Sequence, residues 1–418
     1  MPMVRNVLLI LLLANSFLVR AQFELNAQIR PRTELRNGYR FPAGESSELA
    51  FFVSQRTRLS FLYNDTMLDA NITLQDVRVW GDETIASDNP GLGIAMAYAT
   101  LRPFKDFSVR AGRQEISLGD QRLFGMAEWR QAARSHDALW VRWQPGKYDV
   151  SAIGAFNQNA ERLGSTSYGL NQYKALGILY AKREGALLDV DGIMAADGIQ
   201  NLYSGGSETD WRYTTGLNVA VDIASFKLFA GQHIQRGTRF IDRKDIRAFM
   251  GVAGASYSFG KWRFNFTTEV LSGRDSTSED YTAFDNLYAS RHRFFGYMDY
   301  FVSFPFDPDE GGLQHTQLSA AYRPAPQHTI ELTGHSFYLE ERVRDAATGV
   351  LTGKELGQEL DLLYTFDMRS DISVTFCHSL YWSTDDLALI KGGDPSIVNH
   401  FTYLMLDVRP VFFRSKGK

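Results

Sequence analysis

Arginine side chains recur at even spacings in several segments of this chain, often beside glutamates. Of the 44 basic residues, 33 are Arg and 11 are Lys by count along the sequence. A guanidinium group donates hydrogen bonds from a planar fork that matches a carboxylate, so an Arg-rich face is suited to binding carboxylates. In the clearest segment, Arg30, Arg32 and Arg36 share a period of two with Glu24 and Glu34. The pattern indicates a charged face that can bind anions.

The positions between these charges are apolar, which predicts strands with two unlike faces. Leu25, Ala27 and Ile29 alternate with the charges of the first segment, and Leu59 and Phe61 do so in the next. Successive side chains on a strand point to opposite faces. An Arg on the lipid-facing wall of a membrane barrel costs about 2–4 kcal/mol at the midplane. The charged faces are therefore predicted to line a lumen.

Ten Arg and four Glu are predicted to line that lumen. The Arg residues are Arg30, Arg32, Arg36, Arg56, Arg58, Arg78, Arg110, Arg113, Arg142 and Arg263, and the acidic neighbours are Glu24, Glu34, Glu115 and Glu269. The collective excess of Arg predicts an electropositive passage that concentrates anions. For each single Arg, the alternative is an interior Arg–Glu ladder that holds the wall together.

Two breaks in the alternation affect the assignment of Arg78, Arg113 and Glu115. Apolar residues at 72 and 74 are in one phase and those at 77 and 79 are in the other, and a similar slip occurs around Glu115. A β-bulge produces such a slip and re-aims the side chains that follow it. On this interpretation all three charged side chains point inward.

The joints between the expected strands are short at every second position. Asn64 to Leu68 and Ile223 to Ala224 are short, whereas Asn37 to Glu48 and Ser272 to Gly312 are long. Transmembrane β-barrels sort their joints in this way, with tight periplasmic turns and long outer loops. The chain is therefore predicted to be an all-β, up-and-down antiparallel transmembrane barrel of about eighteen strands. Both termini should lie in the periplasm, and the joint from Ser272 to Gly312 should be the largest outer loop.

The N-terminus carries the pattern of a cleaved signal peptide at residues 1–21. Arg5 supplies the positive charge, Val7 to Leu13 the apolar run, and Val19 to Ala21 the small-residue cleavage pattern. Residues 22–418 are then expected to form one outer-membrane barrel in contact with lipid. The single cysteine, Cys377, excludes an intrachain disulfide and a cysteine metal cluster.

Three segments together resemble the alginate export family of outer-membrane β-barrel porins. They are GRQEISLGDQRL at 112–123 with RSHDA at 134–138, FDNLY at 284–288 with His292 and GYMD at 296–299, and LGQELDL at 356–362; QDVRVW at 75–80 is similar to that family's third strand. The resemblance implies an eighteen-stranded monomeric barrel in the outer membrane of a Gram-negative-type bacterium. It also implies an Arg-lined lumen that passes an anionic polysaccharide, such as an alginate-like polyuronate, outward.

Other functions remain as alternatives. A general or anion-selective porin for small solutes or oligosaccharides would use the same Arg-lined lumen. A secreted soluble β-protein would not need the alternation of joint lengths. Nucleic acid is not an expected partner, because the formal net charge is −4 and the chain is predicted to be exported.

The pattern of nucleophiles and histidines does not favour an enzyme. Cys377, His378 and Ser379 are consecutive, so neighbouring side chains point to opposite faces of a strand and cannot form one catalytic set. The eight His residues include no pair spaced as a metal site. We therefore expect no catalytic residues, no metal site and no cofactor.

Overall fold

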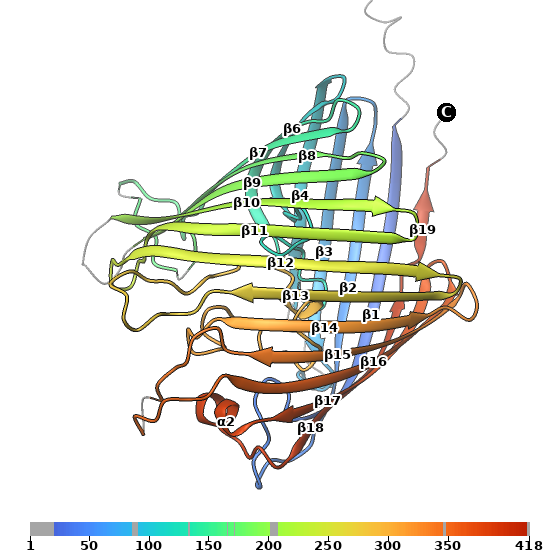
Figure 1. Cartoon of the computed structure of the whole chain (residues 1–418). Coiled ribbons are helices and arrows are strands. Elements are labelled where there is room, and N and C mark those ends of the chain that lie inside the picture. The colour runs from blue at the N-terminus through green and yellow to red at the C-terminus, as the bar shows by residue number, and fades with distance from the viewer. Residues whose placement is uncertain are drawn as a thin grey trace, which may run out of the picture.

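The computed structural model describes residues 21–85, 91–132, 134–164, 166–170, 172–200, 208–345 and 348–415. These residues form a closed antiparallel barrel of 18 strands, which confirms the predicted fold class (Figure 1). The predicted signal peptide lies outside the described residues except for Ala21.

The strands occupy most of the chain and are long enough to cross a membrane. Their bounds are β1 Gln22–Asn37, β2 Ala50–Asn64, β3 Leu68–Val79, β4 Leu92–Phe104, β5 Phe107–Gln114, β6 His136–Trp143, β7 Tyr148–Phe156, β8 Ala175–Arg183, β9 Leu188–Gln200, β10 Thr209–Ile223, β11 Phe226–Thr238, β12 Asp245–Phe259, β13 Trp262–Leu271, β14 Leu313–Tyr322, β15 His328–Tyr338, β16 Glu355–Arg369, β17 Ile372–Ser383, β18 Val398–Val408 and β19 Val411–Arg414. A 3-10 turn covers Arg291–Arg293, and helix α2 covers Asp385–Lys391. No helix among the described residues is long and apolar enough to cross a membrane.

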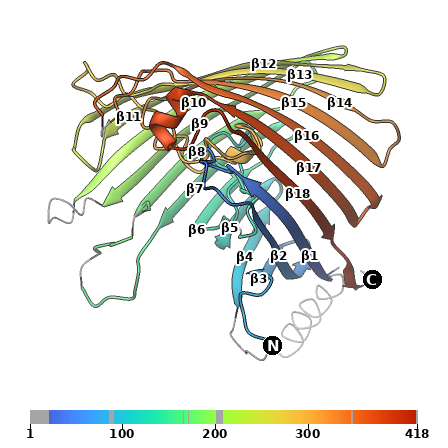
Figure 2. The same cartoon turned by 90° about the horizontal axis from the view of Figure 1, so that it is seen from below.

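The last strand closes the barrel against the first. Ile29 of β1 is in register with Val408 of β18, and Leu25 is in register with Phe413 of β19. Residues 409–410 separate these two pieces, since Pro410 has no N–H to donate to a ladder. β18 and β19 therefore act as one interrupted strand. Viewed from below, β18 lies directly beside β1 (Figure 2).

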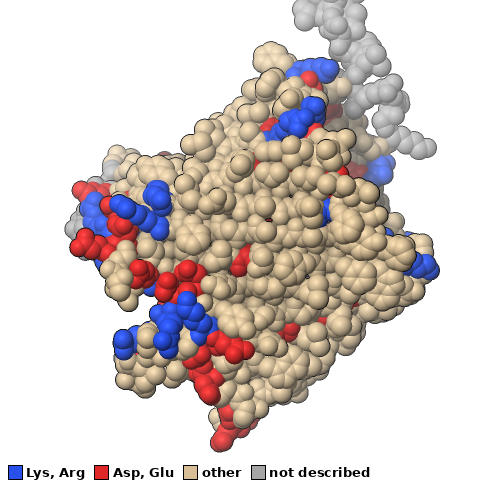
Figure 3. All heavy atoms as spheres, in the orientation of Figure 1, with Lys and Arg blue, Asp and Glu red and all other residues tan. Residues whose placement is uncertain are grey.

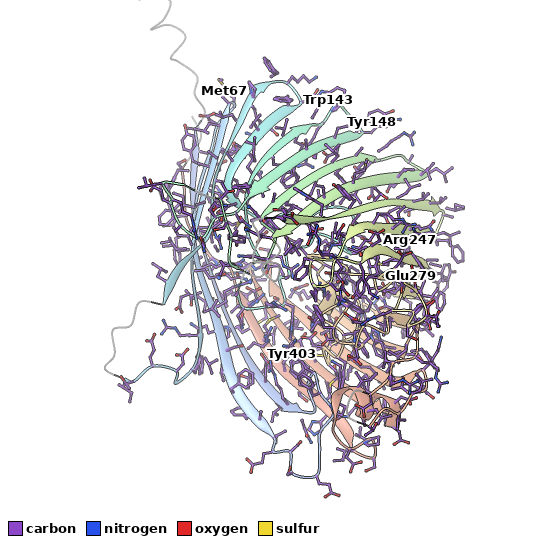
Figure 4. All side chains as sticks on the ribbon, turned by 90° about the vertical axis from the view of Figure 1, so that its left-hand side faces the viewer. Met67, Trp143, Tyr148, Arg247, Glu279 and Tyr403 are labelled. Atoms are coloured by element: carbon purple, nitrogen blue, oxygen red, sulfur yellow. The ribbon has the colours of Figure 1, made fainter. Side chains whose placement is uncertain are left out.

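The two ends of the barrel differ as the joint lengths predict. Gln22 at the start of β1 pairs with Asn64 at a short turn, and Glu24 pairs with Arg414 near the other terminus. Both described ends of the chain therefore lie at the short-turn end. In Figure 4, Met67 and Trp143 lie together at the upper edge, where the short turns are.

The outward rows of side chains form an uncharged belt. Leu217, Phe264 and Phe266 are exposed on the outer face, and Phe266 is in register with Ala255 and Leu318. The space-filling view shows this belt as a broad tan surface over β11–β15, with charged side chains gathered toward its ends (Figure 3). Such a belt matches the apolar band that a membrane barrel presents to lipid.

Two long joints fold into the lumen instead of extending outward. The first is residues 115–135, between β5 and β6, and the second is residues 272–312, between β13 and β14. We call them the first and second inner loops. Phe284, Phe301 and Tyr300 of the second inner loop are buried among inward side chains such as Phe337 and Tyr381.

The structure thus differs from the expectation that residues 272–312 form an outer loop. The physical reason is the apolar composition of the segment, because side chains such as Phe295 and Met298 would be costly to leave in water. Only a short stretch around residues 274–279 is largely exposed. The two inner loops therefore occupy part of the lumen and reduce its open space.

Candidate channel constriction

Four of the predicted lumen Arg residues lie together on β1 and β2. Arg30 is directly in register with Arg56, and Arg58 is opposite Gln28. Arg30, Arg32, Arg56 and Arg58 are all buried. Like charges directly opposite one another destabilise a sheet unless an opposite charge compensates them. The compensating charges come from the first inner loop and from β1 itself.

Glu128 of the first inner loop supplies one carboxylate to three of these guanidinium groups. Its carboxylate oxygens lie 3.5 Å from Arg30 Nη1, 2.8 Å from Arg56 Nη2 and 3.3 Å from Arg58 Nη1. Burial alone would raise the pKa of Glu128, but the charges of Arg56, Arg58 and Arg30 outweigh it and hold that pKa below its ordinary value. Glu128 therefore stays ionised and pins the loop to the wall.

The backbone of the first inner loop is held by the same Arg residues. Arg30 donates to the carbonyl of Glu128 at 2.9 Å and to Gln131 Oε1 at 3.0 Å. Arg32 donates to the carbonyl of Trp129 at 2.8 Å, and its guanidinium lies 3.7 Å from the centre of the Trp129 ring. These strand Arg residues thus hold a loop in place, which is a different role from the Arg–Glu ladder within the wall that was the alternative.

The other side of the first inner loop is anchored to the opposite wall. Arg122 is ion-paired with Glu269 of β13, and Glu269 also contacts His315 Nδ1 at 2.9 Å. The chain continues from His315 Nε2 to His335 Nδ1 at 2.9 Å and from His335 Nε2 to Asp361 at 3.2 Å. These contacts link four neighbouring strands, β13 to β16. The first inner loop therefore spans the lumen from β1 to β13.

The two inner loops are also joined to each other, and the contacts use the motif segments. Phe124 and Tyr288 form a parallel bridge. Arg134 donates to the carbonyls of Gly125 at 3.3 Å and Ala289 at 2.9 Å, and also to that of Tyr288. Burial, with Arg291 nearby, lowers the pKa of Arg134 to about 10, so it is still charged at neutral pH.

The third motif segment supports the second inner loop from the wall. Glu359 of β16 is buried and accepts a hydrogen bond of 2.8 Å from the backbone N–H of Met298. The three segments that carry the family resemblance thus meet inside the barrel. They are far apart in the sequence because two of them lie mostly in the two inner loops and the third lies in a wall strand that the second inner loop contacts.

A third joint, residues 38–49 between β1 and β2, contacts both inner loops. The indole of Trp129 stacks on His292 with ring centres 3.9 Å apart, and His292 Nδ1 lies 2.6 Å from Asp299 Oδ1. The hydroxyl of Tyr39 donates to the other oxygen of Asp299. Burial alone would raise the pKa of Asp299, but His292 and Tyr39 together lower it. Asp299 is therefore a charged link between the second inner loop and residues 38–49, and the first inner loop is reached through the stacking of Trp129 on His292.

These three joints enclose a cavity of about 660 Å³ that is rich in Arg. Arg40, Arg130 and Arg293 line the cavity and are exposed. No ion pair or side-chain hydrogen bond joins any of these three guanidinium groups to another residue in the described part of the chain. Trp129 and Tyr403 contribute aromatic surface, and Tyr403 lies inside the barrel in Figure 4. The cavity therefore presents three guanidinium groups that are available to a ligand.

Several other predicted lumen residues lie on inward rows with local partners. Arg36 bonds Glu34 Oε2 at 2.9 Å from Nε and lies 4.0 Å from the Tyr39 ring centre. Glu34 also accepts from Arg32 at 2.7 Å, so it is a hub of the β1 ladder. Glu115 leaves the wall after β5 and lies near Arg56, where burial and Glu128 raise the pKa of Glu115.

The remaining inward residues lie toward the short-turn end. Arg110 donates to Thr100 Oγ1 at 2.9 Å, Arg142 pairs with Asp149 at 3.0 Å, and Glu24 accepts from Asn26 at 2.7 Å. Arg263 is opposite Ala321 on the inward row of β13, and no ion pair involves it within the described ranges. None of these four residues lies among the residues that line the 660 Å³ cavity.

The inward assignment of Arg78 and Arg113 was wrong, because the strand register places both side chains on outward rows. Arg78 is opposite Gln55 and pairs with Asp76 at 2.7 Å, whereas Arg113 is opposite Asp137 and pairs with it at 3.3 Å. The nearby register shift lies in β4, where Ala95 is the extra residue, and not in β3. For Arg113, β5 continues without a shift to Gln114, so the side chain keeps the phase of the outward row.

Sequence reasoning missed Arg40, Arg130 and Arg293, which lie in joints and not in strands. The alternation rule that assigns side chains to faces does not apply outside a strand. A signal was available for two of them, because Arg130 follows the first motif segment and Arg293 lies within the second. Two of the three free guanidinium groups thus lie in the joints that carry resemblance motifs, whereas Arg40 does not.

A comparison with known protein families agrees with the resemblance carried by these segments. The family model described as alginate export matches residues 21–388. No curated protein sequence matches the chain.

Solved structures of Pseudomonas aeruginosa are similar in fold at low sequence identity. OpdQ has a TM-score of 0.62 and 12% identity, over 94% of this chain and 98% of that one. OpdO has a TM-score of 0.60 and 12% identity, over 96% and 100% of the two chains. The outer membrane protein opdK has a TM-score of 0.59 and 12% identity, over 94% and 99%. Because the family model matches most of its length, this chain belongs to the alginate export family of β-barrels in the Gram-negative outer membrane.

Proposed function

We propose that this outer-membrane channel passes an anionic polysaccharide, an alginate-like polyuronate, and that the Arg-rich cavity is where its carboxylates bind. The observation that carries the proposal is the set of three exposed guanidinium groups, on Arg40, Arg130 and Arg293, at the point where the inner loops narrow the lumen. A guanidinium group binds a carboxylate through two parallel hydrogen bonds. The family membership supports a channel of this kind.

The arrangement favours passage over permanent binding. A confined passage with low-dielectric walls strengthens the attraction for anions relative to bulk water. Because the three guanidinium groups come from three different joints, a chain of carboxylates can exchange one contact for the next. Conduction needs sites that are strong enough to admit the ligand and weak enough to release it. We propose no catalytic role, and we propose that the barrel works as a monomer.

A second candidate is an anion-selective porin for small solutes or oligosaccharides. The observation that favours it is the docking of both inner loops, which leaves a cavity of only about 660 Å³ at the constriction. A small carboxylate fits such a space without any movement of the loops. The two candidates differ in whether a long polyuronate enters the channel.

Single-channel recording in planar bilayers separates the candidates. We expect polymannuronate to block the open channel transiently, whereas a neutral dextran of the same length does not. If only short uronate oligomers block, the small-solute porin is the correct function. If neither polymer nor oligomer blocks and cations pass as readily as anions, the channel does not select anions at all.

The role of the cavity is tested by removing its free charges. We expect the combined change Arg40→Gln, Arg130→Gln and Arg293→Gln to lower the anion-over-cation permeability ratio and to weaken block by polymannuronate. The matched control changes Arg78, Arg113 and Arg247 to Gln, because all three lie on outward rows. Both triples remove three positive charges, so a general effect of net charge would appear in both. Equal effects of the two triples would contradict the assignment of the cavity.

A further inference from the structure

The contact between Glu128 and the strand Arg residues pairs a carboxylate with guanidinium groups, as the proposed binding of a uronate would. Glu128 presents a carboxylate to Arg30, Arg56 and Arg58, and a uronate would present the same group. Arg56 Nη2 and Arg58 Nη1 each donate one hydrogen bond to the Glu128 carboxylate, at 2.8 Å and 3.3 Å, so neither contact is a bidentate fork. The Arg site is therefore occupied, but its capacity to donate hydrogen bonds is only partly used.

Unused donors remain in this Arg site. Within the described residues, Nε and Nη1 of Arg56 and Nη2 of Arg58 have no hydrogen-bond partner although they are buried. A buried charged donor without a partner is costly, so the site gains free energy from any further acceptor that reaches it. Glu115 and Asp407 also lie near these Arg residues, but within the described residues neither accepts a side-chain hydrogen bond from Arg30, Arg56 or Arg58. The Arg site can therefore donate more hydrogen bonds to a carboxylate than it donates to Glu128.

Glu128 separates this Arg site from the open cavity. The side chain of Glu128 is 39% exposed and lines the cavity, whereas the side chain of Arg56 behind it is 0% exposed. The residue before it, Ala127, has φ of 52°, in the left-handed region that disfavours residues with a Cβ atom. Contacts such as those of Glu128 hold this conformation, and their release allows the backbone to relax.

We propose that Arg30, Arg56 and Arg58 form a second carboxylate-binding site, which Glu128 occupies as an internal substitute until a uronate carboxylate displaces it. This proposal rests on the proposed function and adds to it. An anion that enters the cavity first meets the free groups of Arg40, Arg130 and Arg293. It then competes with Glu128 for the buried site, and its success removes the side-chain contact of Glu128 with the β1–β2 wall, while the bonds of Arg30 and Arg32 to the loop backbone remain.

The test uses Glu128→Gln, which keeps the shape of the side chain and removes its charge. We expect the concentration of glucuronate that half-blocks a single channel to fall about tenfold, since a competing charge-assisted contact has been removed. The anion-over-cation permeability ratio should also rise. Glu279→Gln is the matched control, because Glu279 is exposed in the second inner loop and makes the same charge change away from this site.

A double variant keeps the test decisive if loop docking is disturbed. Adding Arg58→Gln to Glu128→Gln should abolish the gain in glucuronate affinity if the gain arises at the Arg site. A gain that persists in the double variant would overturn the proposal, as would an unchanged half-blocking concentration in Glu128→Gln. If the unaltered channel itself shows no block by uronate, the proposed function fails; if it shows block that Glu128→Gln leaves unchanged, only the internal-substitute site fails.

Discussion

Replacing Arg122 with Gln should release the first inner loop from the β13 side of the lumen. Arg122 is the ion-pair partner that this loop gives to Glu269, and the two side chains are only 7% and 1% exposed. The barrel itself should stay folded, because Arg122 belongs to a joint and takes no part in the strand ladders. The change therefore acts on loop docking and not on the wall.

The magnitude follows from the burial of the pair. Removal of one partner of a buried ion pair costs about 3–5 kcal/mol, because the other charge is left uncompensated. Among the described residues, Glu269 would keep the hydrogen bond with His315 Nδ1 at 2.9 Å as its remaining side-chain contact of this kind. A loss of about 4 kcal/mol shifts the ratio of docked to released loop by roughly a thousandfold. The remaining anchors at Glu128 and Arg134 limit the release to the β13 side.

The assay is single-channel conductance combined with limited proteolysis in detergent. We expect larger and noisier conductance and new cleavage within residues 115–135. Arg113→Gln is the control, because its ion pair with Asp137 is exposed on both sides and such pairs contribute only about 0–1 kcal/mol.

An Arg122→Gln variant that folds and conducts like the unaltered protein would contradict this prediction. That result would mean that the loop is held by its other contacts and that the buried pair adds little. A barrel that fails to assemble would contradict the separation between loop docking and wall stability.

Three further predictions concern the lipid face, acid and loop position. Phe264→Arg should lower the free energy of unfolding in lipid by about 2–4 kcal/mol, whereas Asn265→Arg, on the inward row, should be tolerated; equal losses in urea titrations would mean that the faces are misassigned. Because the pKa of Glu128 is lowered, its contribution to loop docking should be complete above the ordinary pKa of Glu and lost as the pH falls through the lower folded-state pKa. Conductance should therefore increase only in that acidic range, and a channel with Glu128→Gln should lack this pH-dependent increase. Ser276→Cys should react with an impermeant maleimide on intact cells and Ala289→Cys should not, because residue 276 is exposed and residue 289 is buried; reaction at both positions would place the second inner loop outside the barrel.

The resemblance motifs had a physical meaning that was not apparent from the sequence. The segments at 112–138, 284–299 and 356–362 are far apart along the chain, and no periodicity relates them. Inside the barrel, Arg134 bonds the backbone at Tyr288 and Ala289, and Glu359 bonds the backbone of Met298. The motifs thus encode loop docking, which strand patterns alone do not describe.

The sequence by itself determined the strands, their faces wherever the alternation is unbroken, and the two ends of the barrel. Alternation is a local property, so Phe264 and Asn265 could be assigned to opposite faces without knowledge of the neighbouring strands. Joint lengths are also local, and they placed the termini at the short-turn end correctly.

Only the tertiary structure decided what the Arg residues contact. Arg56 is compensated by Glu128, which is 72 positions away along the chain. Arg78 faces outward because the extra residue of the register shift, Ala95, lies in the partner strand β4. The free Arg residues lie in joints, where no repeating geometry relates position to direction. Register and loop docking depend on contacts between distant segments, and for this reason local patterns could predict the wall of this channel but not its constriction.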